Sequence, residues 1–291
     1  MSANGGLCHI VITPSRNEHE QLPSLIETMS KQTIPPSRWV IVNHNSQDST
    51  MGLLAEICDE FDWISTITVN DSSKRRRGSQ IAKLFNAGMS IIEEDWQFCS
   101  KIDADMTLPN DYFEKIFSKF AKSENLGVAS GSCFVVKGSK KIYEVVPQDH
   151  TRGGLKTYRR ECFDEIGGVK EVNGWDGIDN ITAQMKGWAT KHFPDIEVEH
   201  KRLTGAYSGL TRGCFETGQF AYSMRYFPPF LVARCIHRMA RRPFIIGGIS
   251  MFAGYCHAFL SRHSASCGPE TNSFLRKKQK RRILFWRSKS N

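Results

Sequence analysis

Short apolar runs alternate with segments of helical periodicity over the first 105 residues, and this alternation restricts the fold more than any other feature of the sequence. The apolar runs cover residues 8–13, 39–42, 64–69 and 96–99, and the helical patterns between them cover 22–32, 53–61 and 81–89. Short runs rich in β-branched and aromatic side chains are typical of buried strands. Strands that alternate with helices in this way predict an α/β fold with a parallel sheet and helices on its faces.

Clusters of polar residues follow three of the predicted strands, at 14–18, 43–46 and 103–105. Because ligands bind beyond the carboxyl ends of the strands in such sheets, we expect the three clusters to meet at one edge. In the third cluster Asp103 and Asp105 stand two positions apart, so on a strand they point to the same side. Carboxylates are hard ligands that suit Mg²⁺ or Mn²⁺, and an acidic turn that closes the strand is the alternative interpretation.

Further along the chain the pattern predicts more elements of both kinds. We expect a helix at 112–120 and a strand at 126–136, and the segment 174–179 leads into another helix. Asp176 and Asp179 lie at the start of that helix, where a carboxylate can cap free backbone N–H groups. The same position is at the edge of the sheet, so a capping role and a catalytic role do not exclude each other.

In their order along the chain, these motifs resemble those of family 2 glycosyltransferases of the GT-A fold. Residues 11–18 (VITPSRNE) are similar to the opening V-x-x-P-x-x-N-E strand of the family, and residues 42–50 (VNHNSQDST) to its V-D-D-G-S-x-D-x-T segment. Asn86-Ala87-Gly88 matches the N-x-G helix, and Asp103-Ala104-Asp105 matches the metal-binding acid pair.

The later part of the chain extends the resemblance to about residue 205. Residues 158–168 are similar to the acceptor-side R-R-x-x-F-x-x-I-G-G segment, and residues 174–179 occupy the place of the acidic catalytic motif. The resemblance implies a GT-A-like, Rossmann-type sheet that is mixed and mainly parallel, with helices on both faces. This sheet carries the catalytic site and is followed here by a C-terminal helical extension.

The implied reaction is transfer of a sugar from a nucleotide diphosphate to a hydroxyl, with inversion of the anomeric centre. Asp105 would hold the Mn²⁺ or Mg²⁺ that bridges both phosphates, and Asp103 would contact the ribose or the donor sugar. A cation beside the departing diphosphate stabilises its charge without proton transfer. One more carboxylate must deprotonate the acceptor hydroxyl. The position after Gly174-Trp175 favours Asp179, counting back from Gly187-Trp188 favours Asp176, and Asp179 is the preferred assignment.

The donor side would be formed by residues of the polar clusters and by nearby cations: Pro14, Ser15, Arg16, Asn17, Glu18, Asn43, His44, Arg77, Lys83 and Asp103. Asn43 and His44 replace two acids that lie near the nucleobase in the family, so the motif does not name the base. Lys156 and Arg159 are the candidates for the acceptor side, with a solvated surface as the alternative. His200 follows a predicted strand and is a candidate metal ligand beside Asp105, with phosphate binding or a purely structural role as the alternatives.

The C-terminal third has a different pattern. We divide the chain into a catalytic domain (1–205), a helical extension (206–273) and a basic tail (274–291). Residues 244–260 form a nearly uncharged apolar run with arginines at both ends. The run is a little shorter than the about 20 residues that span a bilayer, so we expect a re-entrant or interfacial helix on a membrane. A helix packed on the catalytic domain is the alternative.

Charge and cysteine content favour the cytoplasmic side of an inner membrane. The formal net charge is +9, nearly all of it from eight basic residues after Phe274. The body of the chain is therefore not basic in the way of a nucleic-acid-binding protein, whereas the tail would be attracted to an anionic leaflet. Nine scattered cysteines and the lack of a signal-peptide pattern at the start favour a reducing compartment.

We therefore expect a metal-assisted, inverting glycosyltransferase that acts on a cell-surface glycan or a lipid-linked precursor. Two other functions stay open. A nucleotidyltransferase would carry a glycine-rich phosphate loop after the first strand, where this chain has Pro14-Ser15-Arg16-Asn17-Glu18. A membrane-tethered scaffold that binds sugar nucleotides without activity is consistent with Asn43-His44, although the retained Asp103 and Asp105 argue against it.

Overall fold

The computed structural model describes residues 7–70, 78–144, 146–202 and 209–288. The chain divides into two compact units, Met1–Arg202 and Leu203–Asn291. Every residue predicted for the site belongs to the first unit.

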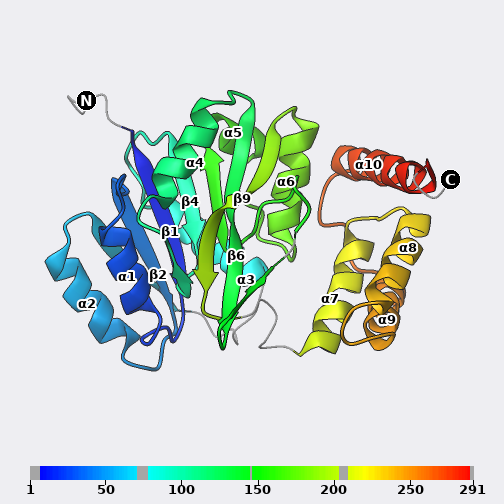
Figure 1. Cartoon of the computed structure of the whole chain (residues 1–291), viewed down its shortest axis with the longest axis horizontal. Coiled ribbons are helices and arrows are strands. Elements are labelled where there is room, and N and C mark those ends of the chain that lie inside the picture. Colours follow the sequence, from blue (N-terminus) through cyan, green and yellow to red (C-terminus); the bar gives the residue numbers. More distant parts are fainter. Residues whose placement is uncertain (1–6, 71–77, 145, 203–208, 289–291) are drawn as a thin grey trace. The chain divides into compact units, whose positions relative to one another are not determined.

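A mixed sheet runs through the middle of the first unit (Figure 1). Its strands are β1 (His9–Ser15), β2 (Arg38–His44), β3 (Ile64–Val69), β4 (Phe98–Ile102), β5 (Met106–Thr107), β6 (Leu126–Lys137), β7 (Lys140–Tyr143), β8 (Leu155–Arg159) and β9 (Ala189–His200). They follow the order β3-β2-β1-β4-β8-β6-β9-β5, with β7 paired to β6. Strands β1 to β4 run parallel, and β8 is antiparallel to both of its neighbours. The predicted mixed, mainly parallel sheet is confirmed.

Helices cover both faces of this sheet. They are α1 (Leu22–Ser30), α2 (Thr50–Glu60), α3 (Ser79–Met89), α4 (Tyr112–Ala121), α5 (Arg160–Ile166) and α6 (Trp175–Met185). Because successive strand residues point to opposite faces, Val11 and Ile41 pack with α1, α2 and α4, whereas Ile12 and Val42 pack with α3, α5 and α6. Burial of both faces explains why β1 and β2 are continuously apolar rather than alternating.

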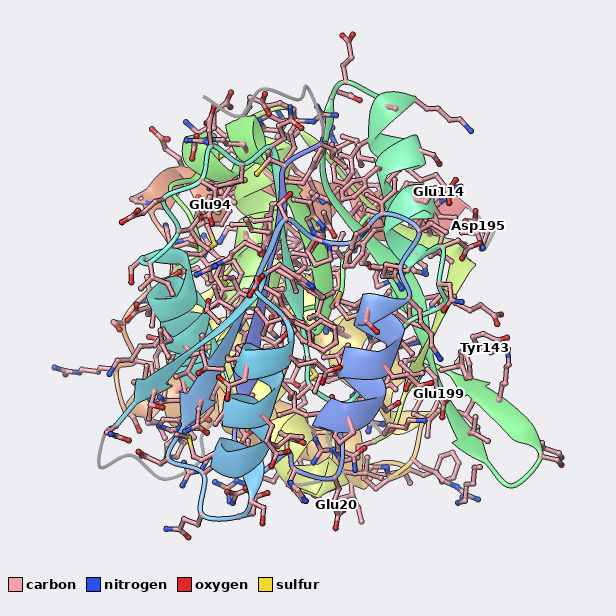
Figure 2. The ribbon with its side chains drawn as sticks, turned by 90° about the vertical axis from the view of Figure 1, so that its left-hand side faces the viewer. Glu20, Glu94, Glu114, Tyr143, Asp195 and Glu199 are labelled. Atoms are coloured by element: carbon pink, nitrogen blue, oxygen red, sulfur yellow. The ribbon has the colours of Figure 1, made fainter. Side chains whose placement is uncertain are left out.

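The pairing of β7 with β6 and that of β5 with β9 were not expected from the sequence. The β6–β7 hairpin carries Tyr143 and extends away from the body of the unit (Figure 2). The short strand β5 pairs with the end of β9, so that Met106 lies opposite His200. The second pairing brings the residues after β4 beside the end of β9, and it helps to build the site described below.

The second unit is helical, with α7 (Leu210–Ser223), α8 (Pro228–Met239), α9 (Ile246–Leu260) and α10 (Pro269–Ser288). Helices α7 and α9 can approach closely because Gly254 has no Cβ. A Cβ at this position would lie only 2.0 Å from the backbone oxygen of Phe215. The expected C-terminal helices are confirmed, and most of the segment 274–291 belongs to α10. No helix among the described residues is long and apolar enough to span a bilayer.

Candidate functional site

The loops after β1 and β2 form one continuous surface at the carboxyl edge of the sheet. Ser15 of β1 lies opposite Asn43 of β2, so both strands end at the same level. The backbone N–H of Asn17 donates to Ser46 Oγ (2.9 Å), and the Asn17 side-chain oxygen accepts from the N–H of Gln47 (2.8 Å). Asn17 has a φ of 53°, a left-handed conformation that Asn tolerates better than most residues. The first two polar clusters therefore meet.

The end of β2 presents buried polar groups at this edge. One ring nitrogen of His44 lies 3.5 Å from Arg16 Nη1, and the other lies 3.3 Å from Gln80 Nε2. The Asn43 side-chain amide donates to Met51 Sδ, while its oxygen is buried without a hydrogen-bond partner. A buried acceptor without a partner is costly, so this oxygen is well suited to accept a hydrogen bond from a ligand.

Asp103 is held between the end of β4 and the start of β8. Its carboxylate contacts the Nζ of Lys101, and its backbone N–H donates to the oxygen of Gly154 (2.9 Å). A Cβ on Gly154 would lie 2.4 Å from Asp103 Oδ2, and a Cβ on Gly153 would lie 3.1 Å from Asp176 Oδ2. The glycine pair therefore lets Asp103 and Asp176 approach the same short stretch of chain.

Asp105 belongs to a cluster of charged side chains at the end of β9. Its Oδ2 lies 2.8 Å from Arg202 Nε and 3.3 Å from His200 Nε2. Arg202 also pairs with Glu18 Oε2 at 2.6 Å, and His200 Nδ1 lies 3.6 Å from Glu144 Oε1. Arg202 thus links the loops that follow β1, β4 and β9.

The charges of this cluster shift one another's pKa values. Burial alone would raise the pKa of Asp105, but the hydrogen bonds and positive charges of His200 and Arg202 outweigh burial and lower the pKa to about 2. Burial alone would lower the pKa of His200, but Asp105 and Glu144 raise it to about 9. At neutral pH the cluster therefore contains charged acids and charged bases that neutralise each other.

This arrangement does not fit a divalent cation. Carboxylate and imidazole are suitable donors for Mn²⁺, and the predicted ligands Asp105 and His200 do lie together. Their donor atoms are directed at each other and at Arg202, and Asp103 is engaged by Lys101. Across the part of the chain that the structure describes, no three histidine, cysteine or acidic side chains are grouped so that they could hold a metal ion. A cation could bind Asp105 only if Arg202 moved away.

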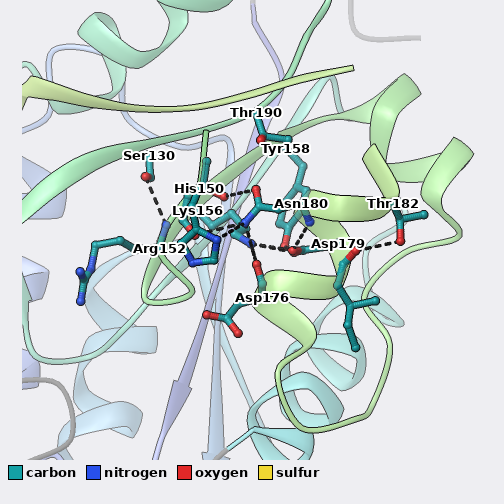
Figure 3. A network of polar contacts seen from close by, with 12 residues as sticks. Ser130, His150, Arg152, Lys156, Tyr158, Asp176, Asp179, Asn180, Thr182 and Thr190 are labelled. Atoms are coloured by element: carbon teal, nitrogen blue, oxygen red, sulfur yellow. Dashed lines mark hydrogen bonds and ion pairs between the residues drawn. The ribbon is translucent and has the colours of Figure 1, made fainter. Parts of the chain in front are cut away.

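Asp179 is buried and fully engaged by its neighbours (Figure 3). Both of its carboxylate oxygens lie 2.8 Å from Lys156 Nζ, and the Tyr158 hydroxyl donates to Oδ2. Burial raises the pKa of Asp179, although the Lys156 charge acts in the opposite direction. A carboxylate held in this way inside the core is not available to an acceptor hydroxyl, so the preference for Asp179 as the base is reversed.

Asp176 is only half-buried and lies in the first turn of α6. Its backbone oxygen accepts from Lys156 Nζ and Asn180 Nδ2, both at 2.7 Å, while its carboxylate points away from Asp179 (Figure 3). The helix begins after Gly174, which has a φ of 77° and occupies the N-cap position. The expectation that one of the two aspartates caps this helix is therefore wrong.

The other predicted residues are distributed unevenly. Lys156 is completely buried below the edge, where it neutralises Asp179, and it does not line an acceptor surface. Arg159 lies opposite Phe98, at the far end of β4 from Asp103, and donates to two backbone oxygens there. Lys83 is exposed on α3, and Arg77 lies outside the described residues.

Three contributors to the site were missed in the sequence. Arg202 and Glu144 join it only through the pairing of β9 with β5 and the course of the chain after β7, and no local pattern reveals these pairings. The pair Gly153-Gly154 carried a usable signal, because adjacent glycines before an acidic motif indicate a close approach of the backbone to other groups.

Comparison with protein families gives a match within the first unit. The model described as Glycosyl transferase family 2 matches residues 10–171, which is more than half of the chain. A search of curated protein sequences found no match.

Solved structures of low sequence identity have the same fold. TarS 1–349 of S. aureus in complex with UDP is 15% identical with a TM-score of 0.52, over 67% of this chain and 61% of that one. The mannosyltransferase PcManGT of Pyrobaculum calidifontis, in complex with GDP-Man and Mn²⁺, is 18% identical with a TM-score of 0.57, over 90% and 76%. GalNAc-T7 with UDP, GalNAc and Mn²⁺ is 15% identical with a TM-score of 0.54, over 68% and 44%. These likenesses show the GT-A fold.

Proposed function

Because the chain belongs to glycosyl transferase family 2, we propose that the carboxyl edge of β1, β2 and β4 binds a nucleotide-diphosphate sugar and transfers the sugar to a hydroxyl with inversion. The observation that supports this best is the approach of Asp103 and Asp176 to the glycine pair Gly153-Gly154. One carboxylate can then contact the donor while the other faces the acceptor, and no side chain stands between them on that stretch of chain.

Asp176 is the residue that we assign as the general base. As the acceptor oxygen attacks the anomeric carbon, its proton passes to the Asp176 carboxylate. The bond from that carbon to the diphosphate oxygen breaks on the opposite face of the sugar, and the diphosphate leaves with the electron pair. A positioned base contributes about 10²–10⁴-fold to such a rate. The half-buried position of Asp176 and its orientation away from Asp179 support the assignment.

The end of β2 is assigned to the nucleobase. The unpartnered oxygen of Asn43 can accept a hydrogen bond from a base N–H, which both uracil and guanine offer. TarS and PcManGT were solved with UDP and GDP-Man, respectively. We therefore propose a uridine or guanosine diphosphate sugar as the donor class.

Positive charge for the departing diphosphate is assigned to arginines at the same edge. Arg202 lies against Asp105 and Glu18, and Arg16 lies against His44. Fixed cations beside a developing phosphate charge lower the barrier to its departure. We assign no step to a divalent cation, because Arg202 and His200 already engage Asp105.

For the acceptor we propose a glycan or a lipid-linked precursor. The support comes from the second unit, whose exposed apolar side chains and arginines suit a membrane surface.

Nucleotide binding and turnover separate this function from its rivals. The purified chain is screened by thermal shift with UDP, GDP and their sugars, with and without Mn²⁺, and release of nucleoside diphosphate is then measured. We expect one nucleotide to stabilise the chain and Asn43→Ala to weaken its binding about tenfold through the lost hydrogen bond. Glu94→Gln is the control and should bind normally, because Glu94 (Figure 2) precedes the amino end of β4, whereas the site lies beyond its carboxyl end. Stabilisation by a nucleotide sugar without turnover would favour the inactive scaffold, and absence of both stabilisation and turnover would contradict the proposed function.

A further inference from the structure

Helix α9 carries apolar side chains on both of its faces. One face is buried against α7 and α8 and consists of Gly247, Gly248, Met251, Gly254 and Ala258. The other face is solvent-exposed and carries Ile246, Ile249, Phe252 and Phe259, whose exposed fractions are 56%, 55%, 49% and 61%. A helix that is apolar all round is normally enclosed by protein or lipid, so it is unusual for this second face to be exposed to water.

Further exposed apolar side chains lie at the two ends of α9. Phe244 and Ile245 precede the helix and are 59% and 61% exposed, and Leu260 at its end is 78% exposed. The apolar face of α9 is defined here as these three residues together with Ile246, Ile249, Phe252 and Phe259. Contiguous exposed apolar patches of this kind mark interaction surfaces, whereas scattered single residues do not.

Positive charge surrounds the apolar face of α9. Arg241 and Arg242 come immediately before it and Arg262 immediately after it, and all three are exposed. The sequence has no acidic residue from 217 to 269, while this stretch contains six arginines. The charge around the face is therefore of one sign.

A second feature of the same unit also suits an anion. A hollow of about 460 Å³ beside the start of α10 is lined by four cations, namely Arg225, Arg276, Lys277 and Lys280, and by no acid. Its other lining residues are small or uncharged. A phosphate-bearing headgroup has the size and the charge to occupy such a hollow.

We propose that the apolar face of α9 docks on an anionic lipid bilayer, with the helix lying in the plane of the interface. Fifteen residues give α9 a length of about 22 Å, which is less than the roughly 30 Å of a bilayer core. A helix with an apolar face and cations at its borders is suited to lie between acyl chains and headgroups. A second copy of the chain would bring arginines against arginines, and a nucleic acid would leave the apolar face in water.

This inference does not depend on the proposed reaction, but it bears on the acceptor. A chain held at a bilayer by its second unit works where lipid-linked acceptors are concentrated. Failure of nucleotide binding would therefore overturn the proposed function alone, and failure of vesicle binding would overturn the docking surface alone.

Vesicle sedimentation of the full chain tests the proposal. We expect the chain to pellet with vesicles of phosphatidylcholine and phosphatidylglycerol at low salt, with at least tenfold weaker binding to phosphatidylcholine alone. The double variant Ile249→Ser/Phe252→Ser should lose at least tenfold in affinity for the anionic vesicles. The triple variant Arg241→Gln/Arg242→Gln/Arg262→Gln should lose a similar factor and most of its salt dependence.

Matched controls keep the test decisive. Val136→Ser/Ile142→Ser removes two apolar side chains of similar exposure from the β6–β7 hairpin and should bind vesicles as the wild type does. Circular dichroism of every variant confirms that it is folded. Unchanged binding of the serine variant of α9 would show that the basic helix α10 acts alone and would overturn the proposal. If light scattering shows a dimer of the wild type and the serine variant of α9 is a monomer, the apolar face of α9 binds a second copy of the chain. This result would also overturn the proposal.

Discussion

Asp176 and Asp179 stand three positions apart on α6, and their surroundings give them different tasks. Asp179 faces the core, where Lys156 and Tyr158 hold it, and it fixes α6 against β8. Asp176 is one turn nearer the helix start, and its carboxylate points away from Asp179 (Figure 3) and lies beside Gly153. Residue type alone could not separate them, because both are aspartates of one acidic motif and only the burial of Lys156 distinguishes their roles.

Gly154→Ala tests how closely Asp103 is fitted to β8. The added Cβ would lie 2.4 Å from Asp103 Oδ2, so the carboxylate must move and nucleotide-sugar affinity or turnover should fall at least about tenfold. Gly52→Ala is the matched control, since nothing lies within 4 Å of a Cβ at this position on α2. It should leave activity unchanged and stabilise the helix by up to about 1 kcal/mol. Normal activity of Gly154→Ala would contradict the placement of Asp103.

His9 predicts how the stability of the sheet depends on pH. It is fully buried, donates or accepts through Nε2 at 2.9 Å from Ser100 Oγ, and burial lowers its pKa to about 3. Since the unfolded chain binds this proton near pH 6.5 and the folded chain does not, the free energy of unfolding should fall as pH drops below 6.5. The loss is about 1.4 kcal/mol for each pH unit down to about pH 3.

Urea unfolding of the wild type and of His9→Gln at pH 7.5 and pH 5.0 measures this effect. The glutamine side chain does not bind a proton in this range. Between the two pH values the wild type should therefore lose about 2 kcal/mol more unfolding free energy than the variant. Equal changes in the two proteins would show that His9 titrates normally in the folded chain.

At the scale of elements, the pairing of β5 with β9 decides what surrounds Asp105. This ladder places His200 opposite Met106, and Arg202 follows two residues later against Asp105 and Glu18. The metal-binding role that the sequence predicts for Asp105 and His200 meets a competing guanidinium at this point.

Arg202→Gln tests that competition. Removal of the guanidinium leaves Asp105 without its closest cation, so Mn²⁺ alone should bind the variant at least about tenfold more tightly than the wild type by calorimetry. Lys201→Gln, which removes an exposed neighbouring charge paired with Glu199, is the control. Equally tight Mn²⁺ binding by wild type and variant would mean that Arg202 does not occupy the cation position.

At the scale of the whole molecule, local pattern predicted the elements, and long-range pairing decided the details. The alternation of apolar runs with helical periodicity predicted β1 to β4 and α1 to α4, because each signal lies within one short segment. Strand β5 is too short for a pattern, and the end of β8 overlaps the segment that resembles the acceptor-side motif. The prediction that Arg159 lies on the acceptor side is wrong for this reason. Arg159 belongs to the antiparallel strand β8, which carries it away from the carboxyl edge of β4.

The division of the chain into two units gives the molecule two sets of surface chemistry. The first unit gathers carboxylates, Asn43 and arginines at one edge of a sheet, and the second exposes an apolar helix face bordered by arginines. We infer that the first unit performs the transfer and that the second holds the chain where its acceptor is found.

Asn substitutions at Asp176 and Asp179 test directly whether Asp176 acts as the base while Asp179 positions α6. Transfer rate, nucleotide-sugar affinity and unfolding free energy are measured for both. Asp176→Asn should lower the rate at least about 100-fold with affinity and stability unchanged. Asp179→Asn should lower the unfolding free energy by about 3–5 kcal/mol, since it leaves the Lys156 charge buried without its partner. Full transfer by Asp176→Asn, with loss of transfer in a stably folded Asp179→Asn, would contradict the account.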